Sequence, residues 1–150
     1  PDIVGRADRR DDSELTPAER VLAVILALWE PLNLALFVAP VLTSIATRGT
    51  ATAAFLLARI VIAGIGIAAG ISLWRNDPHA RRLAATALIL STVAAAVTST
   101  TTLLPTNIIP GDRWIYLAGV ILFNGGWLVY LGWTREMGTV AISRWLMRKW

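Results

Sequence analysis

Residues Ala51–Trp74 read ATAAFLLARIVIAGIGIAAGISLW, an apolar stretch in which Arg59 is the single charge. An α-helix rises about 1.5 Å per residue, so roughly 20 such residues cross the hydrocarbon core of a bilayer. Three further stretches have the same character, namely Val21–Ala46, Leu83–Leu104 and Trp114–Trp133. The sequence therefore predicts an all-α fold, a bundle of four transmembrane helices within residues 21–134.

The composition limits the classes of function. The chain is 55% hydrophobic and 16% charged, which is typical of a membrane protein rather than of a soluble domain. It has no cysteine and one histidine, which excludes disulfides, thiolate metal sites and cysteine nucleophiles. The sequence shows no Ser/His/Asp set, phosphate-binding loop or carboxylate pair. We therefore expect no catalytic residue, no metal site and no enzyme activity.

The positive charges predict the orientation of the four spans. Eleven of the fourteen Lys and Arg residues lie in the two terminal segments and the connection around residue 78, while the opposite side holds Arg48 and Arg113. Because cytoplasmic loops carry such an excess, both termini are expected in the cytoplasm of a bacterium, with the protein a multi-pass component of the inner membrane. The net charge of +4 then favours anionic lipid headgroups, not nucleic acid, as its partner.

The two ends of the chain differ from the spans. Residues 1–20 are expected to form a polar cytoplasmic tail, which lacks the apolar core of a signal peptide. Thr16, Pro17 and Glu19 fit the N-cap, first and third positions of a helix with a capping box. Residues 135–150 are basic and amphipathic, and we expect a short helix on the inner membrane surface. A frayed basic tail is the alternative.

Small residues predict where helices approach closely, because close backbone contact stabilises helix association in lipid. Gly66 and Gly70 form a G-x-x-x-G pattern, and the stretch 83–104 repeats a small residue at nearly every fourth position. We expect these two spans to pack tightly. The hydroxyl-rich run 98–102 fits either packing, with each hydroxyl bonded to its own helix, or a polar pathway. The expected packing residues are Gly66, Gly70, Ala87, Ser91, Ala95 and Ser99.

Glu30, Asn33 and Arg59 form the candidate intramembrane polar cluster, since an ionisable residue within a span is costly to insert. Counted from the shared turn, Glu30 lies roughly 10 Å deeper than Arg59. Their side chains also lean apart, each toward its own helix N-terminus, which argues against a direct ion pair. Asn33 is the expected bridge between them. Separate snorkelling of the two charges and a working ion, proton or lipid site are the alternatives.

The last span carries an aromatic stripe. Such a stripe could stack on a lipid or a carotenoid-type pigment, or it could face acyl chains or a neighbouring helix. No other cofactor is expected. The residues of the stripe are Tyr116, Phe123, Trp127 and Tyr130.

Two stretches carry a resemblance to known families. Gly70–Arg75 leading into Ala80–Arg82, and Gly126–Tyr130 leading into Thr134 and Arg135, resemble the small bacterial four-span membrane families of unknown function. That resemblance implies a fold and no activity. Glu30 also occupies a place comparable to the membrane-embedded glutamate of small four-span multidrug exporters. Arg59 departs from the pattern of those exporters, because its positive charge would oppose cation binding.

These observations favour a non-catalytic accessory or scaffold subunit of a larger membrane complex. Its expected partners are membrane lipids, other transmembrane subunits and further copies of the chain. A small proton- or ion-coupled transporter that uses Glu30 is the first alternative. A lipid- or pigment-binding subunit is the second.

Overall fold

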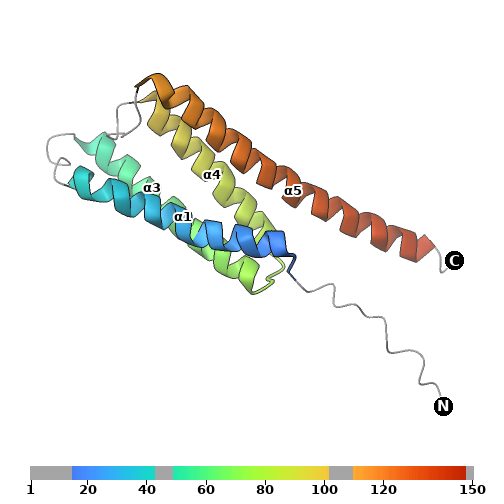
Figure 1. Ribbon diagram of the computed structural model, residues 1–150. Coiled ribbons are helices and arrows are strands. Elements are labelled where there is room, and N and C mark those ends of the chain that lie inside the picture. Colours follow the sequence, from blue (N-terminus) through green and yellow to red (C-terminus); the bar gives the residue numbers. More distant parts are fainter. Residues whose placement is uncertain (1–14, 43–48, 102–109, 148–150) are drawn as a thin grey trace, which may run out of the picture.

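The computed structural model describes residues 15–42, 49–101 and 110–147, and for residues 36–42, 110 and 133–147 it describes the backbone alone. Four long helices make up the described chain (Figure 1), and the expected all-α fold is confirmed. A single 3₁₀ turn, η1 (Pro110–Asp112), precedes the last of them. The helices are α1 (Pro17–Leu42), α3 (Thr50–Trp74), α4 (Ala80–Thr100) and α5 (Arg113–Met147).

The start of α1 is fixed by the predicted capping box. The Glu19 amide donates to Thr16 Oγ1 over 3.2 Å, and the Thr16 amide donates to Glu19 Oε2 over 3.1 Å. Pro17 occupies the first helical position, where its missing N–H leaves no bond unmade. Each side chain of the capping box thus accepts a hydrogen bond from the other residue's backbone N–H, which has no partner within the helix.

Three of the four helices are long and apolar enough to cross a membrane, namely α3, α4 and the segment Arg113–Gly132 of α5. Three of the four predicted spans are thus confirmed, and the expected span Val21–Ala46 lies, from residue 36 on, outside the described side chains. Within the described side chains of α1, Glu19, Arg20 and Glu30 interrupt the apolar sequence.

The last helix corrects a second expectation. α5 continues without interruption from Arg113 to Met147, so the structure has no separate C-terminal helix in the described chain. The sequence after Trp133 contains no proline, and nothing there forces the helix to end. α5 therefore extends beyond the other three helices (Figure 1). Residues 1–14 and 148–150 of the expected terminal segments lie outside the described residues.

α3 lies between α1 and α4, and α4 also packs on α5. The two glycines of the G-x-x-x-G pattern face α1: a Cβ on Gly70 would lie 2.5 Å from the Ala23 carbonyl oxygen, and one on Gly66 would lie 3.1 Å from the Leu26 carbonyl oxygen. The glycine contact thus lies between α1 and α3, whereas we had expected it between α3 and α4. The reason is that α1 supplies small residues of its own, Ala23 and Ala27, opposite these glycines, whereas the prediction compared only the spans 51–74 and 83–104.

The core lies at the end of the bundle where α1 begins and α3 meets α4. Leu22 and Leu73 are fully buried there, against alanines of α4 and Leu131 of α5. At the same end, Asn76 adopts a positive φ of 55° just after α3, a conformation that asparagine tolerates better than most residues. The first turn of α1, the turn between α3 and α4, and Tyr130 of α5 consequently share one end of the bundle.

Candidate functional site: a buried ion pair and a lateral cavity

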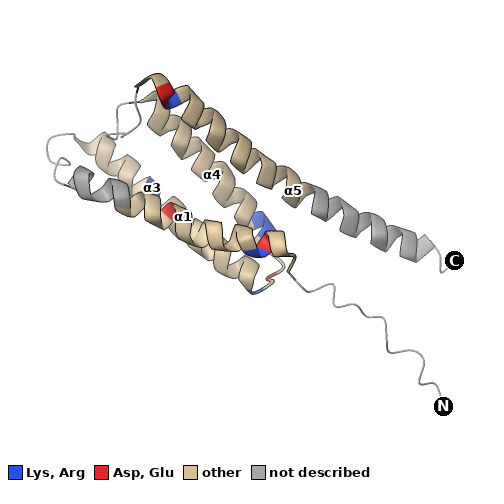
Figure 2. Cartoon of the chain, in the orientation of Figure 1, with Lys and Arg blue, Asp and Glu red and all other residues tan. Residues whose placement is uncertain are grey.

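Most described charged residues lie near the helix ends, and Glu30 and Arg59 are the exceptions (Figure 2). Their side chains come from α1 and α3 and form an ion pair with an Arg59 Nη2 to Glu30 Oε2 distance of 3.4 Å. The Ser91 hydroxyl of α4 donates to the other carboxylate oxygen, Oε1. The two side chains are only 12% and 8% exposed, so the pair is shielded by protein on several sides. One carboxylate thereby connects three helices.

The direct pair corrects our expectation. A Cβ on Gly66 would lie 3.8 Å from the Glu30 Cβ, so these two positions face each other. Arg59 precedes Gly66 by two helical turns, roughly 10 Å along the axis, and the predicted offset is therefore present. The two long side chains together span this offset, so that their charged ends lie 3.4 Å apart.

Asn33 does not bridge the two charges. Its Nδ2 donates to the Trp29 carbonyl oxygen over 2.9 Å, one turn earlier in the same helix. Ser91, which the small-residue pattern placed among the packing residues, is the polar partner instead. Ala87, Ala95 and Ser99 of that pattern are buried, as close packing of α4 requires.

The hydroxyls of α4 bond mostly within their own helix. Thr98, Thr100 and Thr101 each donate to the carbonyl oxygen four residues earlier, over 2.6–2.8 Å. These bonds are the ones that the packing interpretation predicts, whereas Ser99 Oγ of the same run is buried without a hydrogen-bond partner among the described residues.

A second ion pair, which the sequence analysis missed, joins the first turns of α1 and α4. Arg81 Nη2 lies 2.9 Å from Glu19 Oε1, and Arg81 Nε donates to the same oxygen over 3.0 Å. Glu19 is 3% exposed, although it stands at the end of a helix. The signal was present, because the third residue of a capping box and the basic start of α4 were both predicted at one end of the bundle.

α5 contacts the other helices through side-chain hydrogen bonds and not through close backbone approach at its glycines. Asn124 Nδ2 donates to Thr92 Oγ1 over 2.8 Å, with Leu88 O at 3.4 Å. The adjacent Gly125 and Gly126 have no atom within 4 Å of an added Cβ, so no helix packs closely on them. At the end of the bundle where α1 begins, the Tyr130 hydroxyl lies 2.9 Å from Thr16 Oγ1.

Three rings of the aromatic stripe of α5 contact one another along the helix. Trp127 contacts Phe123 and Tyr130 edge to face, at ring-centroid distances of 6.4 Å and 5.8 Å. Such T-shaped contacts hold the rings in fixed relative orientations. Tyr116 stands apart from them, two turns before Phe123.

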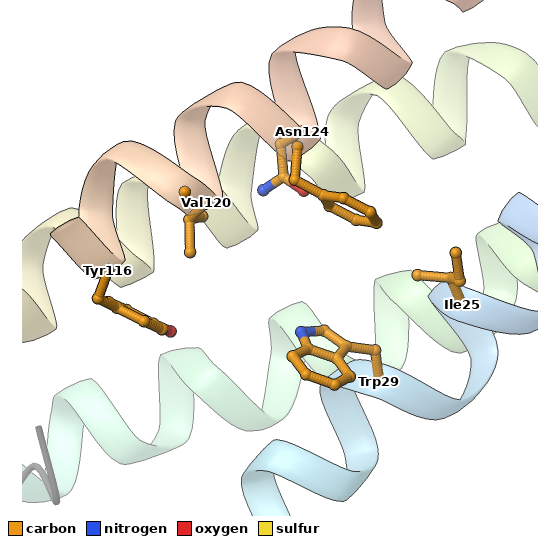
Figure 3. Close-up of a pocket in the computed structure, with 7 residues that line it drawn as sticks. Ile25, Trp29, Tyr116, Val120 and Asn124 are labelled. Atoms are coloured by element: carbon orange, nitrogen blue, oxygen red, sulfur yellow. The ribbon is translucent and has the colours of Figure 1, made fainter.

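Between α1 and α5 lies a lateral cavity of about 540 Å³ (Figure 3). Its walls are mainly apolar, and Tyr116 and Phe123 of the predicted stripe belong to it, whereas Trp127 and Tyr130 do not. The sequence offered no direct signal for it, because it depends on the separation of two helices that are not neighbours in the chain. The lining residues are Ile25, Trp29, Tyr116, Gly119, Val120, Phe123 and Asn124.

The three candidate spans indicate a helical membrane protein. No protein family, curated protein or solved structure matches the chain in the comparisons. The features of the described chain that bear on function are the buried ion pair, the lateral cavity and the exposed faces of the helices.

Proposed function

We propose that the chain is a multi-pass inner-membrane protein in which α1 is the fourth span and both termini are cytoplasmic. Two contacts support a membrane position for α1. It packs closely along α3 at Gly66 and Gly70, so the two helices share one depth. Its central charge, Glu30, is paired with Arg59, which offsets part of the free energy of burying either group alone. The excess of Lys and Arg in the terminal segments and in the connection between α3 and α4, read from the sequence, supports the orientation.

Within the membrane, the proposed role is that of a non-catalytic accessory subunit that makes lateral contacts with a larger complex. The observation that carries this proposal is the division between paired inward charges and outward apolar side chains. Glu19 and Glu30 are buried and each contacts an arginine. Leu57 of α3 and Leu122 of α5, by contrast, are 62% and 76% exposed. Such faces are stable against acyl chains or against other transmembrane helices.

Photo-crosslinking tests this role. A photoreactive amino acid replaces Leu57 or Leu122 in the full chain, and the protein is irradiated in native membranes before mild-detergent purification. The expected result is one discrete protein adduct from at least one position, with the same partner peptide in repeated preparations. The fully buried Leu22 is the control, at which only contacts within the chain are expected. Lipid adducts alone at both outer positions, together with a monodisperse monomer, would exclude the role.

Transport through Glu30 is supported less well by the same geometry. Arg59 and Ser91 already contact the two carboxylate oxygens, so a transported cation would have to displace the arginine. The arrangement resembles a contact that holds three helices together. Binding of an apolar molecule, the other alternative, concerns a different part of the structure.

A further inference from the structure

We infer that the lateral cavity between α1 and α5 binds one uncharged, lipid-like molecule, an aliphatic chain with a polar oxygen in its headgroup. This binding site goes beyond the proposed accessory role and does not depend on it. The volume of about 540 Å³ lies within the roughly 300–1,000 Å³ range of small-molecule sites. Such sites combine apolar walls with a few placed polar groups, and the lateral cavity has this composition.

The polar groups of the cavity lie together. The Tyr116 hydroxyl and the Trp29 indole nitrogen point toward each other from α5 and α1 (Figure 3). Both side chains are partly exposed, Trp29 by 59% and Tyr116 by 40%, and among the described residues neither polar group makes a hydrogen bond. An indole N–H only donates, and a phenol can donate as well. A carbonyl or hydroxyl oxygen between these two residues would satisfy both.

The apolar groups continue from that point. Val120 and Phe123 follow Tyr116 along α5, and Ile25 lies on the facing side of α1 (Figure 3). From residue 116 to 123 the cavity wall extends roughly 10 Å along the axis of α5. A headgroup between Tyr116 and Trp29 therefore places an aliphatic chain along these side chains.

The charge distribution selects an uncharged headgroup. None of the seven lining residues is charged. Arg59 and Glu30, which are opposite in sign and paired with each other, are not among the lining residues. A phosphate would find no free cation in the cavity wall and would lose its hydration on entry. Neutral glycerolipids and isoprenoid carbonyl compounds share the chemistry that fits.

Photolabelling of the full chain in nanodiscs tests the inference. The probe is a diacylglycerol with a diazirine on one acyl chain, and the labelled residues are mapped by mass spectrometry. The expected label lies in peptides around residues 25–29 and 116–124. Unlabelled diacylglycerol, decylubiquinone and phosphatidylglycerol are the competitors. Stronger competition by the first or by the second distinguishes a glycerolipid from an isoprenoid ligand, whereas equal competition by phosphatidylglycerol would overturn the inference.

Two matched glycine variants report on the cavity itself. Gly119 lines the cavity and Gly125 does not, yet neither has an atom within 4 Å of an added Cβ. Both substitutions by leucine are therefore expected to fold, which circular dichroism checks. Gly119→Leu should reduce labelling about tenfold, while Gly125→Leu should leave it unchanged. Equal labelling of both variants, or label spread over all exposed faces, would show ordinary bilayer contact and refute the site.

The polar end is tested by removing the two donors: Tyr116→Phe removes only a hydroxyl, whereas Trp29→Phe removes the indole N–H together with one ring. Tyr116→Phe and Trp29→Phe each remove one hydrogen bond, which corresponds to about a threefold to tenfold loss of apparent affinity. The loss should apply to diacylglycerol or decylubiquinone and not to a plain alkane competitor. If both variants bind all competitors as the unmodified chain does, the assigned headgroup contact is wrong.

Discussion

Replacing Arg59 by methionine should destabilise the bundle strongly, because it leaves the Glu30 carboxylate buried without its cationic partner. Removal of one member of a buried ion pair typically costs about 3–5 kcal/mol. An exposed ion pair costs much less to break, because solvent screens its charges. Here the Arg59 and Glu30 side chains are only 12% and 8% exposed, so solvent screens the pair little. Ser91 still donates to the carboxylate in the variant, which favours the lower end, about 3 kcal/mol. That is more than a hundredfold in the unfolding equilibrium.

The measurement is reversible unfolding of the full chain by sodium dodecyl sulfate in mixed micelles, followed by tryptophan fluorescence. The double variant Glu30→Gln, Arg59→Met removes both charges and should recover about 2 kcal/mol or more of the loss. Arg75→Met, at an exposed position after α3, is the control and should change stability by less than about 0.5 kcal/mol. The reasoning is refuted if Arg59→Met behaves like this control, or if the double variant is no more stable than the single one.

Two further results are expected. Gly70→Ala should lower the unfolding free energy by about 1–3 kcal/mol relative to Gly64→Ala in the same titration, because the new methyl group would lie 2.5 Å from the Ala23 carbonyl oxygen, whereas Gly64 has no atom within 4 Å. Equal stability of the two variants would contradict the close contact between α1 and α3. Glu30→Gln in liposomes should leave proton flux at the level of empty vesicles and of the unmodified chain at every pH. A pH-dependent flux that the substitution abolishes would instead establish the transporter.

Local features of the fold were accessible from the sequence. The capping box formed by Thr16 and Glu19 depends on residues three positions apart, and the structure confirms it. The apolar stretches likewise predict the helices, since their length and hydropathy are properties of each segment alone. The membrane position of α1 is argued from its packing on α3 instead, because the side chains from residue 36 on lie outside the described part of the chain.

Contacts between helices were harder to predict, because they depend on which neighbour each face meets. The axial offset between Glu30 and Arg59 was estimated well, but the reach of two long, flexible side chains lets their charged ends meet across it. Ser91 looked like a packing residue and is also a hydrogen-bond donor to Glu30. The lateral cavity exists because α1 and α5 stand apart, a distance that no local pattern encodes.

The length of α5 has a mechanical consequence. A helix of 35 residues is roughly 50 Å long, whereas a bilayer core is about 30 Å thick. The 15 residues after Gly132 thus make a stiff arm of roughly 22 Å, continuous with the wall of the lateral cavity. Because the helix is unbroken, a change in the tilt of α5 that widens or narrows the cavity also swings the end of this arm. A molecule that binds in the lateral cavity and changes this tilt is therefore expected to shift the position of residue 147 as well.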